Sequence, residues 1–149
     1  MRRAVPLGFC MAVVAAGCGG GGGVKTLSHD EFVKQANAIC TDYNSRIAAL
    51  GTPQGLADLV AFAQKGSAIA AEDVDKFAKL KPPKADAAGA AEFVAAGRTV
   101  VDQLRRLEAA GRKSDLGAVQ KIAAHGQANS DRSRLIAQRL GLAECAKQG

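Results

Sequence analysis

Apolar residues recur every three or four positions through most of the chain after residue 28. This is the period of one face of an α-helix, and it is interrupted three times, so the pattern predicts four amphipathic helices. The expected inward-facing positions are Phe32, Ala36, Ile39, Tyr43, Ile47 and Leu50; Leu56, Leu59, Val60, Ala63, Ala70, Val74, Phe77 and Leu80; Ala90, Phe93, Gly97, Val100, Leu104 and Leu107; and Leu116, Val119, Ile122, Gly126, Asn129, Ser133, Ile136 and Leu140.

Polar residues, prolines and glycines mark where these helices begin and end. Ser28 and Glu31 have the spacing of a capping box at the start of the first helix. Adjacent prolines exclude helical conformation from the residues before them, so residues 81–84, Lys-Pro-Pro-Lys, end the second helix. The other expected boundaries are Gly51, with Thr52 as the next N-cap, Asp86, Gly111, Ser114 or Asp115, and Gly141.

The expected fold is all-α. Four helices of roughly 23 to 27 residues are each about 35 to 40 Å long, and short connections place consecutive helices antiparallel. We therefore expect an up-down-up-down four-helix bundle over residues 28–149, in which residues 142–145 form a short tail.

The first 17 residues have the pattern of an export signal. Arg2 and Arg3 precede an apolar run, residues 4–16, which ends in small residues. The run is shorter than the roughly 20 residues that span a bilayer. We expect residues 1–17 to be removed, and residues 18–27, which include five consecutive glycines, to form a flexible linker.

Ala15-Ala16-Gly17-Cys18 resembles a bacterial lipobox, although Ala15 stands where a large aliphatic residue is usual. The resemblance implies that Cys18 carries a lipid, becomes the new N-terminus and anchors the protein to the extracytoplasmic side of the cell membrane. The alternative is ordinary cleavage after Ala16, which leaves Cys18 as a thiol on a secreted protein.

Cys40 and Cys145 remain once Cys10 leaves with the signal and Cys18 is lipidated. An even pair in an oxidising compartment predicts a disulfide. The alternative, a metal site, lacks the paired ligand spacing that zinc requires, so we expect no metal.

Composition and motifs argue against catalysis and nucleic-acid binding. The chain carries a net charge of +6, has no Trp and is only 4% aromatic, which disfavours base stacking. His29 and His125 have no second ligand or nucleophile at a useful spacing, and Glu72, Asp73 and Asp75 are typical of a solvated helix face. We expect neither enzymatic activity nor a cofactor.

Basic residues outnumber acidic ones on the last two expected helices. Such a face favours an anionic polymer, lipid headgroups or an envelope protein as partner, although Arg and Lys also commonly cover helix surfaces. The residues are Arg98, Arg105, Arg106, Arg112, Lys113, Lys121, Arg132, Arg134 and Arg139.

The chain after the linker resembles a group of small, uncharacterised actinobacterial lipoproteins with helical bundles. The resemblance is carried by Phe32, Ala36 and Ile39-Cys40, by Leu80-Lys81-Pro82-Pro83, and by Leu140-Gly141-Leu142 ahead of Cys145. These motifs are structural, and the resemblance implies no activity.

Two functions remain open. The first expectation is a lipid-anchored, non-enzymatic interaction module of the cell envelope. The alternative is binding of a small molecule or lipid inside the bundle, because Gly66, Gly97 and Gly126 fall near the middle of three helices and Asn129 adds a polar group. Close helix packing explains the same glycines without a cavity.

Overall fold

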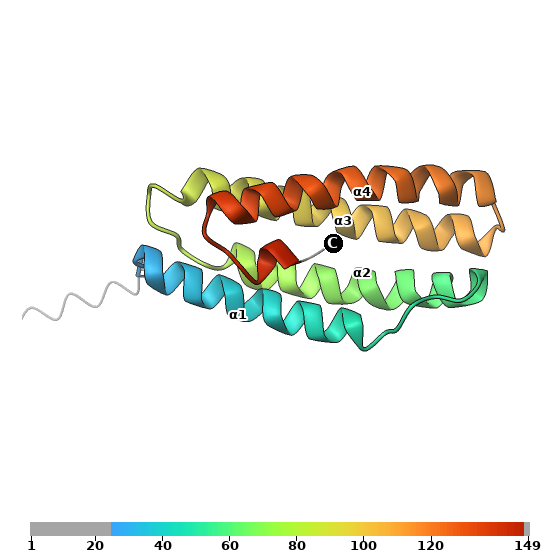
Figure 1. Cartoon of the computed structure of the whole chain (residues 1–149), viewed down its shortest axis with the longest axis horizontal. Helices are drawn as coiled ribbons and strands as arrows, with labels where there is room; N and C mark the ends of the chain where they lie inside the picture. Colours follow the sequence, from blue (N-terminus) through green and yellow to red (C-terminus); the bar gives the residue numbers. More distant parts are fainter. Residues whose placement is uncertain (1–24, 148–149) are drawn as a thin grey trace, which may run out of the picture.

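The computed structural model describes residues 25–147, which form four α-helices and a short final 3₁₀ helix (Figure 1). The described residues contain no strand, so the predicted all-α class and the four helices are confirmed. The predicted signal peptide, Cys18 and the glycine run lie outside the described residues. The elements are α1 (His29–Ala48), α2 (Leu56–Ala78), α3 (Ala87–Arg112), α4 (Leu116–Arg139) and η1 (Cys145–Lys147).

Side chains cap two of the helix starts as predicted. The Ser28 hydroxyl accepts a hydrogen bond from the Glu31 amide at 3.2 Å, and the Glu31 carboxylate accepts one from the Ser28 amide at 2.8 Å. Asp115 caps α4 by accepting from the Ala118 amide at 2.9 Å. Ser114 has a φ of 54°, so it turns the chain while Asp115 takes the cap.

Two predicted boundaries are wrong. Thr52 is not the N-cap of α2, because the helix begins at Leu56 with Gly55 as its cap, and Asp58 accepts a hydrogen bond from the Gln54 amide just ahead of it. Gly111 does not end α3, which continues to Arg112. A Cβ at Gly111 would lie 2.6 Å from Val60 Cγ2, so this glycine allows α2 and α3 to approach.

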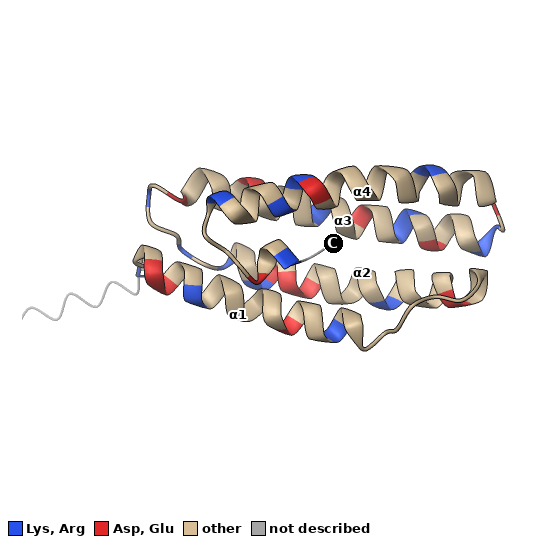
Figure 2. Ribbon diagram, viewed as in Figure 1, with Lys and Arg blue, Asp and Glu red and all other residues tan. Residues whose placement is uncertain are grey.

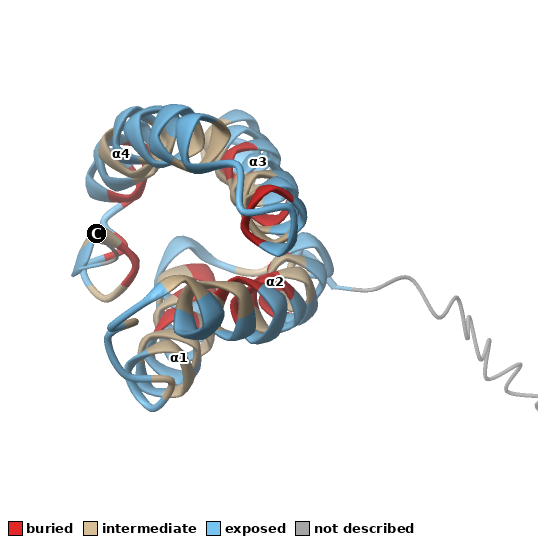
Figure 3. Ribbon diagram, turned by 90° about the vertical axis from the view of Figure 1, so that its right-hand side faces the viewer, coloured by how far each residue is buried: buried red, intermediate tan, exposed pale blue. Residues whose placement is uncertain are grey.

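The four helices form a bundle that is open along one side. Seen end-on in Figure 3, α2 packs on α3, α1 lies beside α2, and α4 lies beside α3. No Cα of α1 comes within 8 Å of a Cα of α4, whereas η1 lies close to both helices. The end of the described chain, rather than direct helix contact, therefore joins the two outer helices.

The segment after α4 is part of the core, although the sequence predicts only a short tail. Gly141 adopts a φ of 71°, and the Leu142 amide bonds back to the Ala137 carbonyl at 2.9 Å, the pattern of a Schellman cap. This turn directs Leu142 and Cys145 inward, where they are 0% and 1% exposed. Cys145 forms the predicted disulfide with Cys40.

A cluster of buried residues lies at the end of the bundle where α1 begins. Phe32, Phe77 and Phe93 make successive aromatic contacts there, with ring centroids 5.9 and 4.8 Å apart. Ile136 and Leu142 complete this core. At the opposite end Leu116, expected to face inward, is 59% exposed, because it occupies the first turn of α4 beyond the end of α1.

None of the helices between residues 25 and 147 combines the length and apolar character that crossing a bilayer requires.

Candidate ligand-binding cavity

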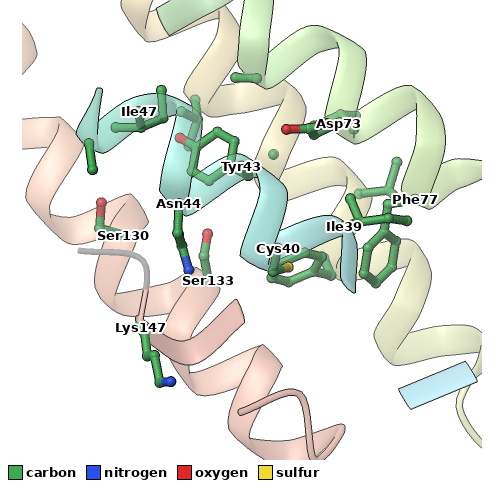
Figure 4. Close-up of a pocket in the computed structure, with 17 residues that line it drawn as sticks. Ile39, Cys40, Tyr43, Asn44, Ile47, Asp73, Phe77, Ser130, Ser133 and Lys147 are labelled. Atoms are coloured by element: carbon green, nitrogen blue, oxygen red, sulfur yellow. The ribbon is translucent and has the colours of Figure 1, made fainter. Parts of the chain in front are cut away.

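A cavity of about 470 Å³ lies between the helices, next to the aromatic core. Every helix and the end of the described chain contribute to its wall (Figure 4). The lining residues are Ile39, Cys40, Tyr43, Asn44, Ile47 and Ala48 of α1; Ala70, Asp73, Val74 and Phe77 of α2; Phe93, Val94, Gly97 and Val100 of α3; Ser130 and Ser133 of α4; and Lys147.

The cavity has the character of a small-molecule site. Its volume falls in the range of roughly 300 to 1,000 Å³ that is usual for ligand pockets. Most of its wall is aliphatic or aromatic, and a few polar side chains interrupt it. Such a site holds the body of a ligand by burial and orients it through those polar groups.

Small side chains and the separation of α1 from α4 create this space. Ala48, Ala70, Ser130 and Ser133 leave room that larger residues would fill. Gly97 acts differently: a Cβ there would lie 2.6 Å from Val74 Cγ2. Gly97 therefore allows close packing of α3 on α2 while its backbone lines the cavity.

Asp73 is the acidic group in the wall, and it is 5% exposed. Its Oδ1 accepts a hydrogen bond from Lys76 Nζ at 3.0 Å, whereas its buried Oδ2 has no hydrogen-bond partner in the part of the chain that the structure describes. A buried polar atom without a hydrogen bond costs about 1 to 3 kcal/mol. Asp73 thus brings an unsatisfied acceptor to a largely apolar cavity.

Ion pairs around Asp73 connect α1 to α2. Arg46 lies 2.7 Å from Glu72 and 3.6 Å from Asp73, and Lys76 lies 2.8 Å from Glu72 and 3.3 Å from Asp42. Hydrogen bonds from Arg46, and then from Lys76, lower the pKa of Glu72 to about 2. The network fixes the α2 turn that carries Asp73 against α1.

Tyr43 faces the cavity from α1, with Asp73 nearby on α2 (Figure 4). Burial, and secondarily the negative charge of Asp73, raise the pKa of the Tyr43 phenol. Its hydroxyl therefore remains protonated at neutral pH and is a second polar group for a ligand.

The residues around η1 cover the open side of the bundle. Asn44 donates to the Glu144 carbonyl at 3.0 Å, and the Glu144 amide donates to the Asn37 side chain at 2.9 Å. Cys40 and Cys145, joined by the disulfide, belong to the hydrophobic core. Lys147, which lines the cavity, forms an ion pair with Glu144 at 2.6 Å.

The structure separates the four residues that the sequence groups around a cavity. Gly97 lines it, but Gly66, Gly126 and Asn129 do not. Gly126 is half-buried and a Cβ there would meet nothing within 4 Å. The Asn129 side chain donates to the Ala96 carbonyl at 3.3 Å and so joins α4 to α3.

Asp73 is the residue that the sequence interpretation missed. The sequence predicts that Glu72, Asp73 and Asp75 form a solvated helix face, which is wrong for Asp73 because it is buried. The position of Asp73 in the sequence indicates burial. Asp73 lies three residues after Ala70 and four before Phe77, both of which face inward. A carboxylate at that spacing lies on the buried face of the helix.

The histidines and other chelating residues form no metal site in the described region. His29 pairs with Asp86 at 2.7 Å, and His125 is exposed on α4. Between residues 25 and 147, no three His, Cys, Asp or Glu side chains lie close enough together to hold an ion.

The basic residues of α3 and α4 are exposed and interspersed with acidic ones (Figure 2). Arg106, Arg112 and Arg134 pair with acids on their own helices. Arg139 pairs with Glu92 of α3 at 2.9 Å. These pairs reduce the excess of positive charge on this face.

Comparisons with protein-family models, curated proteins and solved structures find no match for this chain.

Proposed function

We propose that this protein binds a small, largely apolar molecule in the cavity between its helices. The observation that carries the proposal is the partly open cavity of about 470 Å³ between the helices, which has a mostly apolar wall and a few polar groups. Burial of apolar surface contributes roughly 25 cal/mol per Å². A ligand with the size of a ten-carbon chain would thus gain most of its affinity from burial of its apolar surface against the cavity wall.

A lipid on Cys18 holds the bundle at the outer side of the cell membrane in this proposal. The short connections support an antiparallel up-down-up-down order, in which the linker enters at the aromatic end. The expectation of an interaction module remains a prediction, as does a partner that recognises the basic face. The cavity favours ligand binding over both.

The intrinsic fluorescence of Tyr43 provides a direct test, because the chain contains one tyrosine and no tryptophan. We expect n-decanol to change the emission of Tyr43 with a saturable dependence on concentration. The protein for this experiment is the mature chain from residue 18 with Cys18→Ser, which needs no detergent.

Two substitutions by Phe, one in the cavity and one on the surface, distinguish ligand binding in the cavity from binding at the surface. Val100→Phe fills the cavity from α3, and we expect it to weaken decanol binding at least tenfold. Leu135→Phe adds a ring at a position that is 60% exposed and should leave binding unchanged. Equal affinity of Val100→Phe and the unmodified chain, or the absence of saturable binding, would overturn the proposed function.

A further inference from the structure

The cavity contains a buried acceptor that no group among residues 25–147 satisfies. Asp73 Oδ2 is unpartnered, while the other oxygen of the same carboxylate is occupied by Lys76. Figure 4 shows the Asp73 carboxyl group on the side of α2 that faces Tyr43 and the cavity. A ligand that donates a hydrogen bond here would remove the cost of burying this atom.

The surrounding charges define which donor fits. Three carboxylates, Asp42, Glu72 and Asp73, share two cations, Arg46 and Lys76. The network therefore contains one acid in excess. Asp42 and Glu72 are half-exposed and hydrated, whereas the Asp73 side chain is 6% exposed. One additional positive charge would neutralise this network. A cationic ligand in the cavity would bring that charge next to Asp73.

Among the described residues that line the cavity, no basic side chain is available to pair with an anionic ligand. Lys147 is the basic residue of the wall, and it already bonds Glu144 at 2.6 Å. A carboxylate or phosphate headgroup would also face Asp73, with which it shares the sign of its charge. Like charges in a site of low polarity repel strongly.

We propose that the ligands of this cavity are amphiphiles with one protonated amine on an apolar body, and that Asp73 accepts the N–H hydrogen bond while the aliphatic wall holds the body. This inference rests on the ligand-binding function proposed above. Hydrogen bonds to charged groups contribute about twice as much as neutral ones, so the amine should dominate ligand choice.

The test compares three probes with the same ten-carbon chain: n-decylamine, n-decanol and sodium decanoate, each below its micelle concentration. Tyr43 fluorescence and calorimetry measure their binding to the mature chain with Cys18→Ser. We expect decylamine to bind about tenfold more tightly than decanol, and decanoate to bind most weakly, from the gain of one charged hydrogen bond.

Asp73→Asn removes the acid while keeping the shape of the side chain. We expect this variant to bind decylamine no more tightly than decanol, and to bind decanol within about twofold of the unmodified chain. Asp75→Asn is the matched control: it makes the same charge change on the same helix at an exposed position and should preserve the preference for the amine.

The outcomes distinguish the two proposals. Equal binding of the three probes to the unmodified chain, or an amine preference that survives Asp73→Asn, would overturn the role of Asp73 and leave the ligand-binding function standing. Failure of all three probes to bind would overturn that function. The ranking on the unmodified chain decides the question even if circular dichroism shows that Asp73→Asn does not fold.

Discussion

At the scale of single residues, two of the three mid-helix glycines, Gly97 and Gly126, have opposite surroundings. Gly97 has Val74 Cγ2 2.6 Å from the position of a Cβ, whereas Gly126 has open space. Glycine inside a helix costs about 1 kcal/mol relative to alanine. That cost has a packing explanation at Gly97, and nothing in the structure explains it at Gly126.

Alanine at these two positions should therefore change stability in opposite directions. We expect Gly97→Ala to lower the free energy of unfolding by about 1 to 3 kcal/mol, because Val74 has a stiff χ1 and must shift. Gly126→Ala should raise it by about 0.5 to 1 kcal/mol. Urea denaturation followed by circular dichroism measures both, and stabilisation by Gly97→Ala would refute the packing role.

His29 links the start of α1 to the start of α3 through Asp86. The hydrogen bond to Asp86, and then its charge, raise the pKa of His29 above 6.5. The protonated form is favoured in the folded state, so its stabilising effect is complete below pH 6.5 and disappears as pH rises through the higher folded pKa.

His29→Gln should consequently lower the melting temperature at pH 6 and have much less effect at pH 9. Thermal denaturation of both chains across this range checks the prediction. His125→Gln, which makes the same change at an exposed position of α4, is the matched control. An effect of His29→Gln that is the same at both pH values would contradict the ion-pair role.

At the scale of elements, η1 lies close to both α1 and α4, whose own Cα atoms stay more than 8 Å apart. The disulfide joins it to α1 across 105 positions of sequence. A crosslink that closes so long a loop removes much of the conformational entropy of the unfolded chain. The disulfide therefore stabilises the fold and also keeps this side of the cavity covered.

Replacing Cys40 and Cys145 together by Ser should reduce the free energy of unfolding by about 3 to 5 kcal/mol. Ligand affinity should fall as well, because η1 is then held only by noncovalent contacts. Denaturation with and without dithiothreitol provides the check: the reductant should destabilise the unmodified chain and leave the double variant unchanged. A reductant effect of equal size on both would exclude this disulfide as the cause.

Helix positions were predictable from the sequence because apolar periodicity and capping side chains are local properties. Ser28, Asp115 and Gly141 are examples. Thr52 and Gly111 were not assigned correctly, because Asp58 and the approach of Val60 decide those positions.

The cavity required the tertiary structure. Asp73 shares a face with Ala70 and Phe77, but periodicity does not show that α1 and α4 stay apart or that Asp73 keeps an unpaired oxygen. The same limit applies to Asn129, whose inward position was predictable and whose bond to the Ala96 carbonyl was not.

At the scale of the whole molecule, the aromatic end of the bundle lies between the proposed membrane anchor and the cavity. The Leu27 amide bonds the Lys81 carbonyl at 2.8 Å, which fixes the residue before α1 to the connection between α2 and α3. The aromatic end of the bundle would thus face the membrane, with the cavity beyond it.

Cys18→Ser should release the protein from membranes, because a lipid on Cys18 is its proposed anchor. Fractionation of cells into membrane and soluble material, followed by immunodetection, measures the distribution. Arg139→Ser, which changes an exposed basic residue, should leave the protein in the membrane fraction. Persistent membrane association of Cys18→Ser would refute the lipid anchor.

The position of the disulfide also determines how the molecule would carry mechanical load. Once noncovalent contacts such as the Leu27–Lys81 bond are broken, a pull between residue 25 and residue 147 would pass along residues 29–40 of α1, cross from Cys40 to Cys145 and leave through η1. The 104 residues between the two cysteines lie outside that path. Stretching the oxidised chain would therefore extend only its two short ends, and α2, α3 and α4 would bear no tension along the backbone.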